Sequence, residues 1–264
     1  MEPFQAIILA ILQGLTEFLP ISSSAHLVIP SLILGWPDQG LAFDVAVHVG
    51  TLIAVILFYR RDLWVMTMAC VTPGVAGEAA EQRRLVVLLA LATLPAILAG
   101  LAADDFIENN LRSLPVIAAT TLIFALLLGY ADGRAVQISR QLSWKIALFV
   151  GLAQVLALVP GVSRSGITIT AALLAGLSRH DSARLSFLMS IPVIAGAGFL
   201  KALDLLASGA VVDWFWLGMA TLVAGLTAYA CIKLFLALLD RIGMRPFVYY
   251  RIGLSLLLFA IWLA

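Results

Sequence analysis

Charge is what this sequence has least of. Charged residues make up only 12% of the 264 residues, roughly half of what a soluble globular domain carries. Apolar side chains account for 62% of the chain, and the mean hydropathy is +1.07. This composition excludes a soluble domain and predicts a polytopic membrane protein. The net charge of +1 provides no basic field, so no nucleic-acid partner is expected.

Cysteine and the common catalytic motifs are also scarce. Only Cys70 and Cys231 are present, both in apolar segments, so neither a disulfide framework nor a cysteine metal site is predicted. No HExxH, Walker lysine motif or GxSxG elbow occurs, which excludes the chemistries that these motifs signal. The apolar start lacks a positive n-region and a small-residue cleavage site, so no removable signal peptide is expected.

Long hydrophobic runs are what the sequence does contain. Segments long enough to cross a bilayer, about 17–25 residues, lie at 42–59, 85–103, 114–131, 185–206, 214–239 and 246–263. A shorter stretch at 63–72 is expected to lie along the surface or to cap a loop. The sequence therefore predicts an all-α polytopic membrane protein, with about six transmembrane helices in a single integral membrane domain over residues 1–264.

Four further apolar segments are too short to cross. Residues 4–19 and 25–34 are joined through PISSS, and residues 144–159 and 167–177 through PGVSRSG. A helix as long as the first reaches only about 24 Å, less than the hydrocarbon core of about 30 Å. Each pair therefore predicts a re-entrant helical hairpin with a polar tip inside the membrane. Irregular backbone at that depth must be buried in protein or line a wet cavity.

The basic residues predict the orientation. They gather in loops at 60–61 with 83–84, at 134–145, at 179–184 and at 241–245. Placing these loops in the cytoplasm brings the first hairpin in from outside and the second from the cytoplasm. The C-terminus then lies outside.

The two hairpins resemble each other in sequence. LQGLTEFLPISSSAHL aligns with AQVLALVPGVSRSGIT, with Gln13 opposite Gln154 and SSS opposite SRS, at an offset of 141 residues. Because the halves have opposite predicted orientations, we expect an inverted-topology repeat, with halves at approximately 1–131 and 144–264. Such folds place a site near the midplane, where half-helix N-termini meet.

The serine-rich tips predict an anion site. New helices are expected to begin after Ser22–Ser24 and after Ser163–Ser165, because serine is a good N-cap. The free N–H groups of a helix N-terminus attract anions, and Gly161 and Gly166 allow tight turns. Two such N-termini meeting from opposite sides would form a socket for a phosphate-like group.

Arg164 lies where a charge is expensive, about 2.5–3.5 kcal/mol at the bilayer centre, so it needs a partner or a function. Its planar fork suits bidentate contact with a phosphate. The alternative is a buried ion pair with Glu17 that locks the hairpins together. Glu17 follows Gln13 by four residues, so both side chains share one helix face.

Two histidines are candidates for proton transfer. Ser23 and His26 are three residues apart on one face of the second half-helix. This spacing would let His26 act as base or acid toward a serine hydroxyl or a leaving oxygen; the alternative is a hydrogen-bonded packing residue. For His48 and Asp44, on the first crossing, a functional and a packing role are equally open.

These residues together resemble a known family, the undecaprenyl pyrophosphate phosphatases of bacterial inner membranes, of the bacitracin-resistance type. Its first signature is glutamate or glutamine, three residues, glutamate, then a serine-rich segment and histidine; here it reads QGLTEFLPISSSAH. Its second signature, PGxSRSxxT, reads PGVSRSGIT from Pro160 to Thr168. The resemblance covers the whole chain, through LSFLMSIPVI and FVYYRIG. One departure is Gln13, where many members carry glutamate.

The resemblance implies hydrolysis of undecaprenyl pyrophosphate to undecaprenyl phosphate and inorganic phosphate, which recycles the lipid carrier for peptidoglycan synthesis and gives bacitracin resistance. With the tip chemistry, it assigns catalysis to Glu17, Ser23 (or a water in its place), His26 and Arg164. Phosphate binding is assigned to Gln13, Ser22, Ser163, Ser165, Gly166 and Thr168. A divalent cation, Mg²⁺ or Ca²⁺, is expected at Glu17, with Gln13 or Asp44 as candidate further ligands.

The resemblance also implies partners and a location. The expected partners are a polyprenyl pyrophosphate lipid and membrane lipid, with a homodimer left open. The expected location is the bacterial inner membrane, with the site open to the outer, periplasmic face. The alternative function is a polyprenyl-phosphate flippase or transporter that uses the same anion socket, because inverted repeats with broken helices are typical of transporters.

Overall fold

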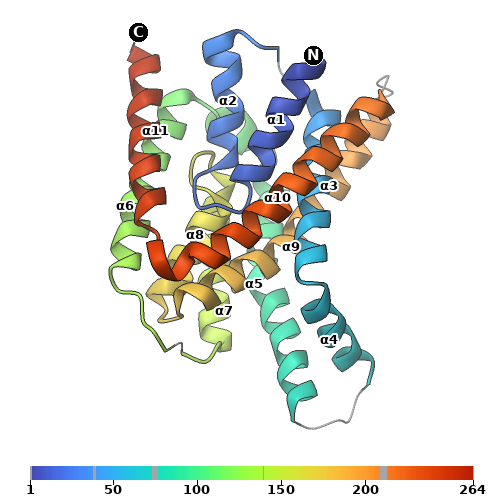
Figure 1. Ribbon diagram of the computed structural model, residues 1–264, viewed down its shortest axis with the longest axis vertical. Coiled ribbons are helices and arrows are strands. Elements are labelled where there is room, and N and C mark those ends of the chain that lie inside the picture. The colour runs from blue at the N-terminus through green and yellow to red at the C-terminus, as the bar shows by residue number, and fades with distance from the viewer. Residues whose placement is uncertain (1, 38–39, 73–76, 139, 209–212, 264) are drawn as a thin grey trace.

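The structure, a computed structural model, describes residues 2–37, 40–72, 77–138, 140–208 and 213–263. These residues form helices and turns, with no strand in the described ranges (Figure 1). The helices are α1 (Pro3–Thr16), α2 (Ser23–Leu34), α3 (Gly40–Phe58), α4 (Arg60–Val71), α5 (Glu78–Asn110), α6 (Leu114–Asp132), α7 (Trp144–Val155), the short 3₁₀ helix η1 (Leu156–Leu158), α8 (Arg164–Leu174), α9 (Arg179–Ser208), α10 (Trp214–Ile242) and α11 (Arg245–Leu263).

Six of these helices are long and apolar enough to cross a membrane: α3, α5, α6, α9, α10 and α11. Each matches one of the predicted crossings, with α3 ending one residue before its predicted segment does, so the all-α polytopic fold is confirmed. Helix α5 begins earlier than its apolar run, because Glu78 and Glu81 in its first turn suit the positive end of a helix dipole. The weaker stretch at 63–72 forms most of the 12-residue helix α4.

Two pairs of short helices stand apart from the crossings. Helices α1 and α2 enter from the end of the molecule that carries both termini, and α7 lies toward the opposite end (Figure 1). Helices α2 and α8 begin at Ser23 and Arg164, earlier than expected, because Ser22 and Ser163 already occupy the N-cap positions. The re-entrant path of each pair through a membrane stays a prediction.

Ser22 and Ser163 share a rare backbone conformation. Their φ angles are 72° and 71°, and no other non-glycine residue in the described ranges has a positive φ. Such a conformation costs about 1–3 kcal/mol at a residue with a side chain, so the surrounding contacts must hold it. The two serines are separated by the offset at which the hairpin sequences align. This pairing supports the inverted repeat, whose two halves stay a prediction.

Helix α10 packs very closely against α1, which leads to the first hairpin turn, and against α3. A Cβ atom at Gly50 of α3 would collide with the backbone of Thr221 and Gly225. A Cβ atom at Gly14 of α1 would collide with the backbone of Ala224. Small residues of this kind let helix backbones approach each other in lipid, where there is little hydrophobic driving force between helices. Helix α10 thus fixes the position of α1 relative to α3.

Replacing Gly50 by alanine should push α3 and α10 apart and lower the free energy of unfolding by about 1–3 kcal/mol. Thermal unfolding of the purified protein in detergent measures this effect. Gly218→Ala is the matched control on α10, because a Cβ atom there meets open space. Equal melting temperatures for the two variants would contradict the close approach.

Candidate functional site

The turns of the two hairpins contact each other directly. The backbone N–H of Gly161 in the second turn donates to the hydroxyl of Ser24, 3.3 Å away. The hydroxyl of Ser165 in turn donates to the carbonyl of Leu19 in the first turn, at 2.8 Å. Residues far apart in the sequence therefore form one polar cluster at the meeting point of the hairpins.

Arg251 of α11 joins both turns. Its side chain is fully buried, and it donates to the carbonyl of Pro20 in the first turn at 3.3 Å. In the second turn it donates to the carbonyls of Gly161 and Val162, at 2.9 and 3.0 Å. A further bond, of 3.3 Å, reaches the carbonyl of Thr121 in α6. Backbone carbonyls thus take the place of a counter-ion.

Sequence reasoning missed this residue. The available signal was an arginine inside the apolar run 246–263, because an ionisable residue within a crossing usually has a specific partner.

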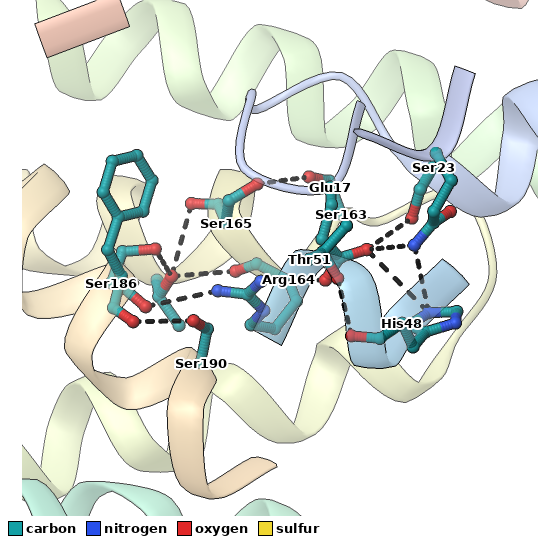
Figure 2. Close-up of polar contacts among 12 residues, drawn as sticks. Glu17, Ser23, His48, Thr51, Ser163, Arg164, Ser165, Ser186 and Ser190 are labelled. Carbon is teal, nitrogen blue, oxygen red and sulfur yellow. Dashed lines mark hydrogen bonds and ion pairs between the residues drawn. The ribbon is translucent and has the colours of Figure 1, made fainter. Parts of the chain in front are cut away.

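Glu17 lies at the centre of the polar cluster, at the end of α1, with a side chain only 8% exposed. Its Oε1 accepts from Arg164 at 3.0 Å. Its Oε2 accepts from the amide of Gln13 at 2.9 Å and from the hydroxyl of Ser23 at 3.3 Å. Figure 2 shows Ser23 and His48 on one side of Glu17 and Arg164 on the other. One carboxylate therefore links α1, α2 and α8.

Arg164 forms the ion pair with Glu17 that was one of the two expectations for it. It also donates to the backbone carbonyl of Ser186 in α9, at 3.2 Å. The guanidinium lies at the first residue of α8, where it adds to the positive end of the helix dipole. Bonds of this kind to a carboxylate are about twice as strong as neutral ones, so Arg164 holds the two hairpins together in the absence of substrate.

His48, whose role was open, belongs to this cluster. Its Nδ1 lies 2.7 Å from the backbone carbonyl of Asp44; a carbonyl only accepts, so Nδ1 carries the ring proton. Its Nε2 then accepts from the amide of Gln13, 3.2 Å away. The Nε2 atom also lies 3.9 Å from Oε2 of Glu17. Asp44 contributes its backbone carbonyl to this arrangement.

His26 is turned toward other partners than Ser23. Its Nδ1 donates to the carbonyl of Ser22 at 2.7 Å, and its Nε2 accepts from the hydroxyl of Tyr250 at 2.6 Å. The imidazole also stacks on the Tyr250 ring, with centroids 5.5 Å apart and planes inclined by 3°. The spacing of three residues therefore does not bring the imidazole to the Ser23 hydroxyl, which bonds to Glu17 instead.

The predicted phosphate ligands of the second tip are built into the turn itself. Ser163 is the N-cap of α8, because its hydroxyl accepts from the N–H of Gly166 at 3.1 Å. Its oxygen also lies 3.2 Å from that of Ser165. The hydroxyl of Thr168 contacts a serine of α9 at 2.8 Å. These contacts hold the turn in shape, and a direct contact of the four residues with phosphate stays a prediction.

The donor set does not fit a divalent cation held by the protein. Glu17 is the only carboxylate of the cluster, and both its oxygens already accept hydrogen bonds. Mg²⁺ and Ca²⁺ take six or more, mainly oxygen, ligands. The part of the chain that the structure describes holds no group of three His, Cys, Asp or Glu residues arranged around a metal position. Of the expected further ligands, Gln13 turns its amide N–H, which cannot bind a cation, toward Glu17, and Asp44 takes part in the cluster through its backbone carbonyl.

Comparison with known proteins gives consistent matches over the full length. A family model described as bacitracin resistance protein BacA matches residues 6–257. An undecaprenyl-diphosphatase of Alcanivorax borkumensis is 56% identical over 273 aligned residues, which cover 100% of both chains. An undecaprenyl-diphosphatase of Colwellia psychrerythraea is 54% identical, over 98% of this chain and 99% of the relative. The matches therefore include both hairpin turns and most of α11.

Replacing Arg251 by methionine should destabilise the protein by about 3 kcal/mol or more, because each buried carbonyl left without a donor costs about 1–3 kcal/mol. Unfolding of the detergent-solubilised variant by heat measures the loss. Arg245→Met, at the exposed start of α11, serves as the control. If both variants melt together, Arg251 does not hold the turns.

Proposed function

We infer, since this chain belongs to the bacitracin resistance protein BacA family, that it hydrolyses undecaprenyl pyrophosphate to undecaprenyl phosphate and inorganic phosphate. Both relatives named above are undecaprenyl-diphosphatases that align along the whole chain. The observation that carries the chemistry is the position of one carboxylate, Glu17, between the hydroxyl of Ser23 and the guanidinium of Arg164. A nucleophile, a proton acceptor and an anion-binding group are thus gathered in one cluster.

In the first step, Ser23 is the nucleophile. Its hydroxyl lies 3.3 Å from Oε2 of Glu17, so Glu17 takes the proton as the Ser23 oxygen attacks the terminal phosphorus. The bond from that phosphorus to the bridging oxygen breaks, and undecaprenyl phosphate leaves with the electron pair. Arg164 stabilises the charge on the equatorial oxygens, the role that fixed cations have in phosphoryl transfer.

In the second step, water hydrolyses the phosphoserine. Glu17 has by then passed its proton to the leaving oxygen, so it can accept a proton from the attacking water. The oxygen of Ser23 is released with its proton restored, and inorganic phosphate leaves. Direct attack by water on the lipid substrate, without the covalent step, is the alternative that the Ser23 variant below decides.

His26 is a positioning residue in this mechanism. It links the hydroxyl of Tyr250 to the carbonyl of Ser22, the residue directly before Ser23 and one of the two with left-handed backbone. The imidazole therefore supports the strained turn that aims Ser23 at Glu17.

The site opens to the outer face of the inner membrane in this proposal. The segment from α4 to the start of α5 carries Arg60, Arg61, Arg83 and Arg84. Helix α4 and the start of α5 lie at the end of the molecule opposite both termini (Figure 1). The positive-inside rule places such an end in the cytoplasm, which brings the α1–α2 hairpin in from the outside, where the spent pyrophosphate carrier is released.

Purified protein in detergent should release inorganic phosphate from undecaprenyl pyrophosphate, because no transport across a membrane is then possible. Arg164→Ala should lower kcat/KM by about 100-fold or more, whereas Arg245→Ala at the start of α11 should leave it unchanged. Absence of release from any polyprenyl pyrophosphate would favour the flippase or transporter. An arm with chelator tests the need for a divalent cation, and light scattering on the same sample tests the homodimer.

Ser23→Ala should lower kcat by about 10³-fold or more and should abolish the labelled phosphoserine that forms from substrate labelled on its terminal phosphate. Ser113→Ala, at an exposed serine before α6 whose side chain makes no capping bond, is the control and should keep both turnover and the label. Near-normal turnover by Ser23→Ala would assign the attack to water.

A further inference from the structure

Gln13 lies between two acceptors at the site. The residue is completely buried, and its amide nitrogen is 2.9 Å from Oε2 of Glu17 and 3.2 Å from Nε2 of His48. These two acceptor atoms are 3.9 Å from each other. They come from different elements, the end of α1 and the middle of α3. One side-chain nitrogen thus occupies the space between them.

Neither acceptor has a proton to offer the other. In the neutral ring of His48 the proton lies on Nδ1, where it binds the carbonyl of Asp44, so Nε2 presents a lone pair. Oε2 of Glu17 belongs to a carboxylate that also accepts from Arg164 through its other oxygen. The two N–H groups of an amide match these two lone pairs. The reverse amide orientation would place Oε1 of Gln13 against both acceptors.

The other end of the amide carries the cost of this orientation. Oε1 of Gln13 is buried and has no hydrogen-bond partner in the described part of the chain. An unsatisfied buried acceptor is unfavourable, so the amide keeps this orientation because its two N–H bonds outweigh the loss. The amide nitrogen is therefore held at the position between Glu17 and His48 by the demands of those two groups.

We propose that the Gln13 amide occupies the place that a divalent cation would otherwise take, linking Glu17 to His48 so that the protein itself holds no cation there. The relevance of this device to catalysis rests on the proposed function, whereas the cation argument itself does not. Gln13 is then a positioning residue for Glu17.

A glutamate at position 13 would reverse the situation. A carboxylate oxygen would replace the nitrogen 2.9 Å from Oε2 of Glu17, with no proton between the two. Two carboxylates and the lone pair of His48 would then converge. Oε2 of Glu17 and Nε2 of His48 are 3.9 Å apart, so both atoms can lie about 2.0–2.1 Å from one small ion. Mn²⁺ accepts carboxylate and imidazole ligands. A single amide-to-carboxylate change should therefore create a cation site.

The test is a titration of Mn²⁺ into substrate-free protein in detergent, with the free ion counted by its electron paramagnetic resonance signal. Gln13→Glu should bind Mn²⁺ about 10–100-fold more tightly than the wild type. Adding Glu17→Gln to that variant should abolish the gain, because it removes one ligand. Gln154→Glu is the matched control, because it places a carboxylate at the aligned position of the second hairpin, where the amide faces the carbonyl of Ala92; it should bring no gain.

The outcomes separate cleanly. Equal affinity of wild type and Gln13→Glu for Mn²⁺ overturns the proposal, as does a gain that survives Glu17→Gln. If Gln13→Glu does not give monodisperse protein, the wild type is compared with Glu17→Gln alone. If the wild type binds Mn²⁺ and Glu17→Gln removes that binding, the proposal is overturned. If the wild type shows no Mn²⁺ binding that depends on Glu17, the proposal is supported. No substrate enters the titration, so failure of phosphate release and failure of this proposal are distinguishable.

Discussion

The site depends on the hydrogen bonds that the guanidinium of Arg251 donates to backbone carbonyls of both hairpin turns. Two turns with irregular backbone meet inside a largely apolar bundle, where a buried carbonyl without a donor is costly. Arg251 supplies donors to Pro20 in one turn and to Gly161 and Val162 in the other. A buried charge is thereby stabilised by carbonyl dipoles, and the dipoles are stabilised by the charge. Together with the ion pair of Arg164 and Glu17, this exchange holds the two turns against each other.

Glu17 performs the corresponding task for the side chains. Each of its two oxygens has a different kind of partner. Oε1 accepts from the cation Arg164, and Oε2 accepts from the neutral donors Gln13 and Ser23. The carboxylate is thus charged and fully bonded, which is the state in which it can take a proton from Ser23. The arrangement needs both hairpins, since Arg164 belongs to the second and the other groups to the first or to α3. Catalysis and the docking of the hairpins therefore use the same contacts.

Much of this could be predicted from local pattern. The six crossings follow from the length and hydropathy of their runs, and the two interrupted pairs from runs too short to cross. The pairing of Arg164 with Glu17 followed from the cost of a charge in an apolar setting. The partner of His26 could not be predicted in this way, because Tyr250 lies 224 residues away. Spacing along α2 indicated only which face His26 shares with Ser23.

By itself, the sequence determined the class of the protein, the number of crossings, the two serine-rich breaks and the residue types available for chemistry. These are properties of composition and of contacts a few residues apart, which solvent preference and helix geometry govern directly. Only the tertiary structure decided which lone pair meets which proton: Arg251 with the turn carbonyls, His48 with Gln13, and His26 with Tyr250. Such pairings depend on the rotation and depth of packed helices, and a shift of one residue along any of them would change every partner.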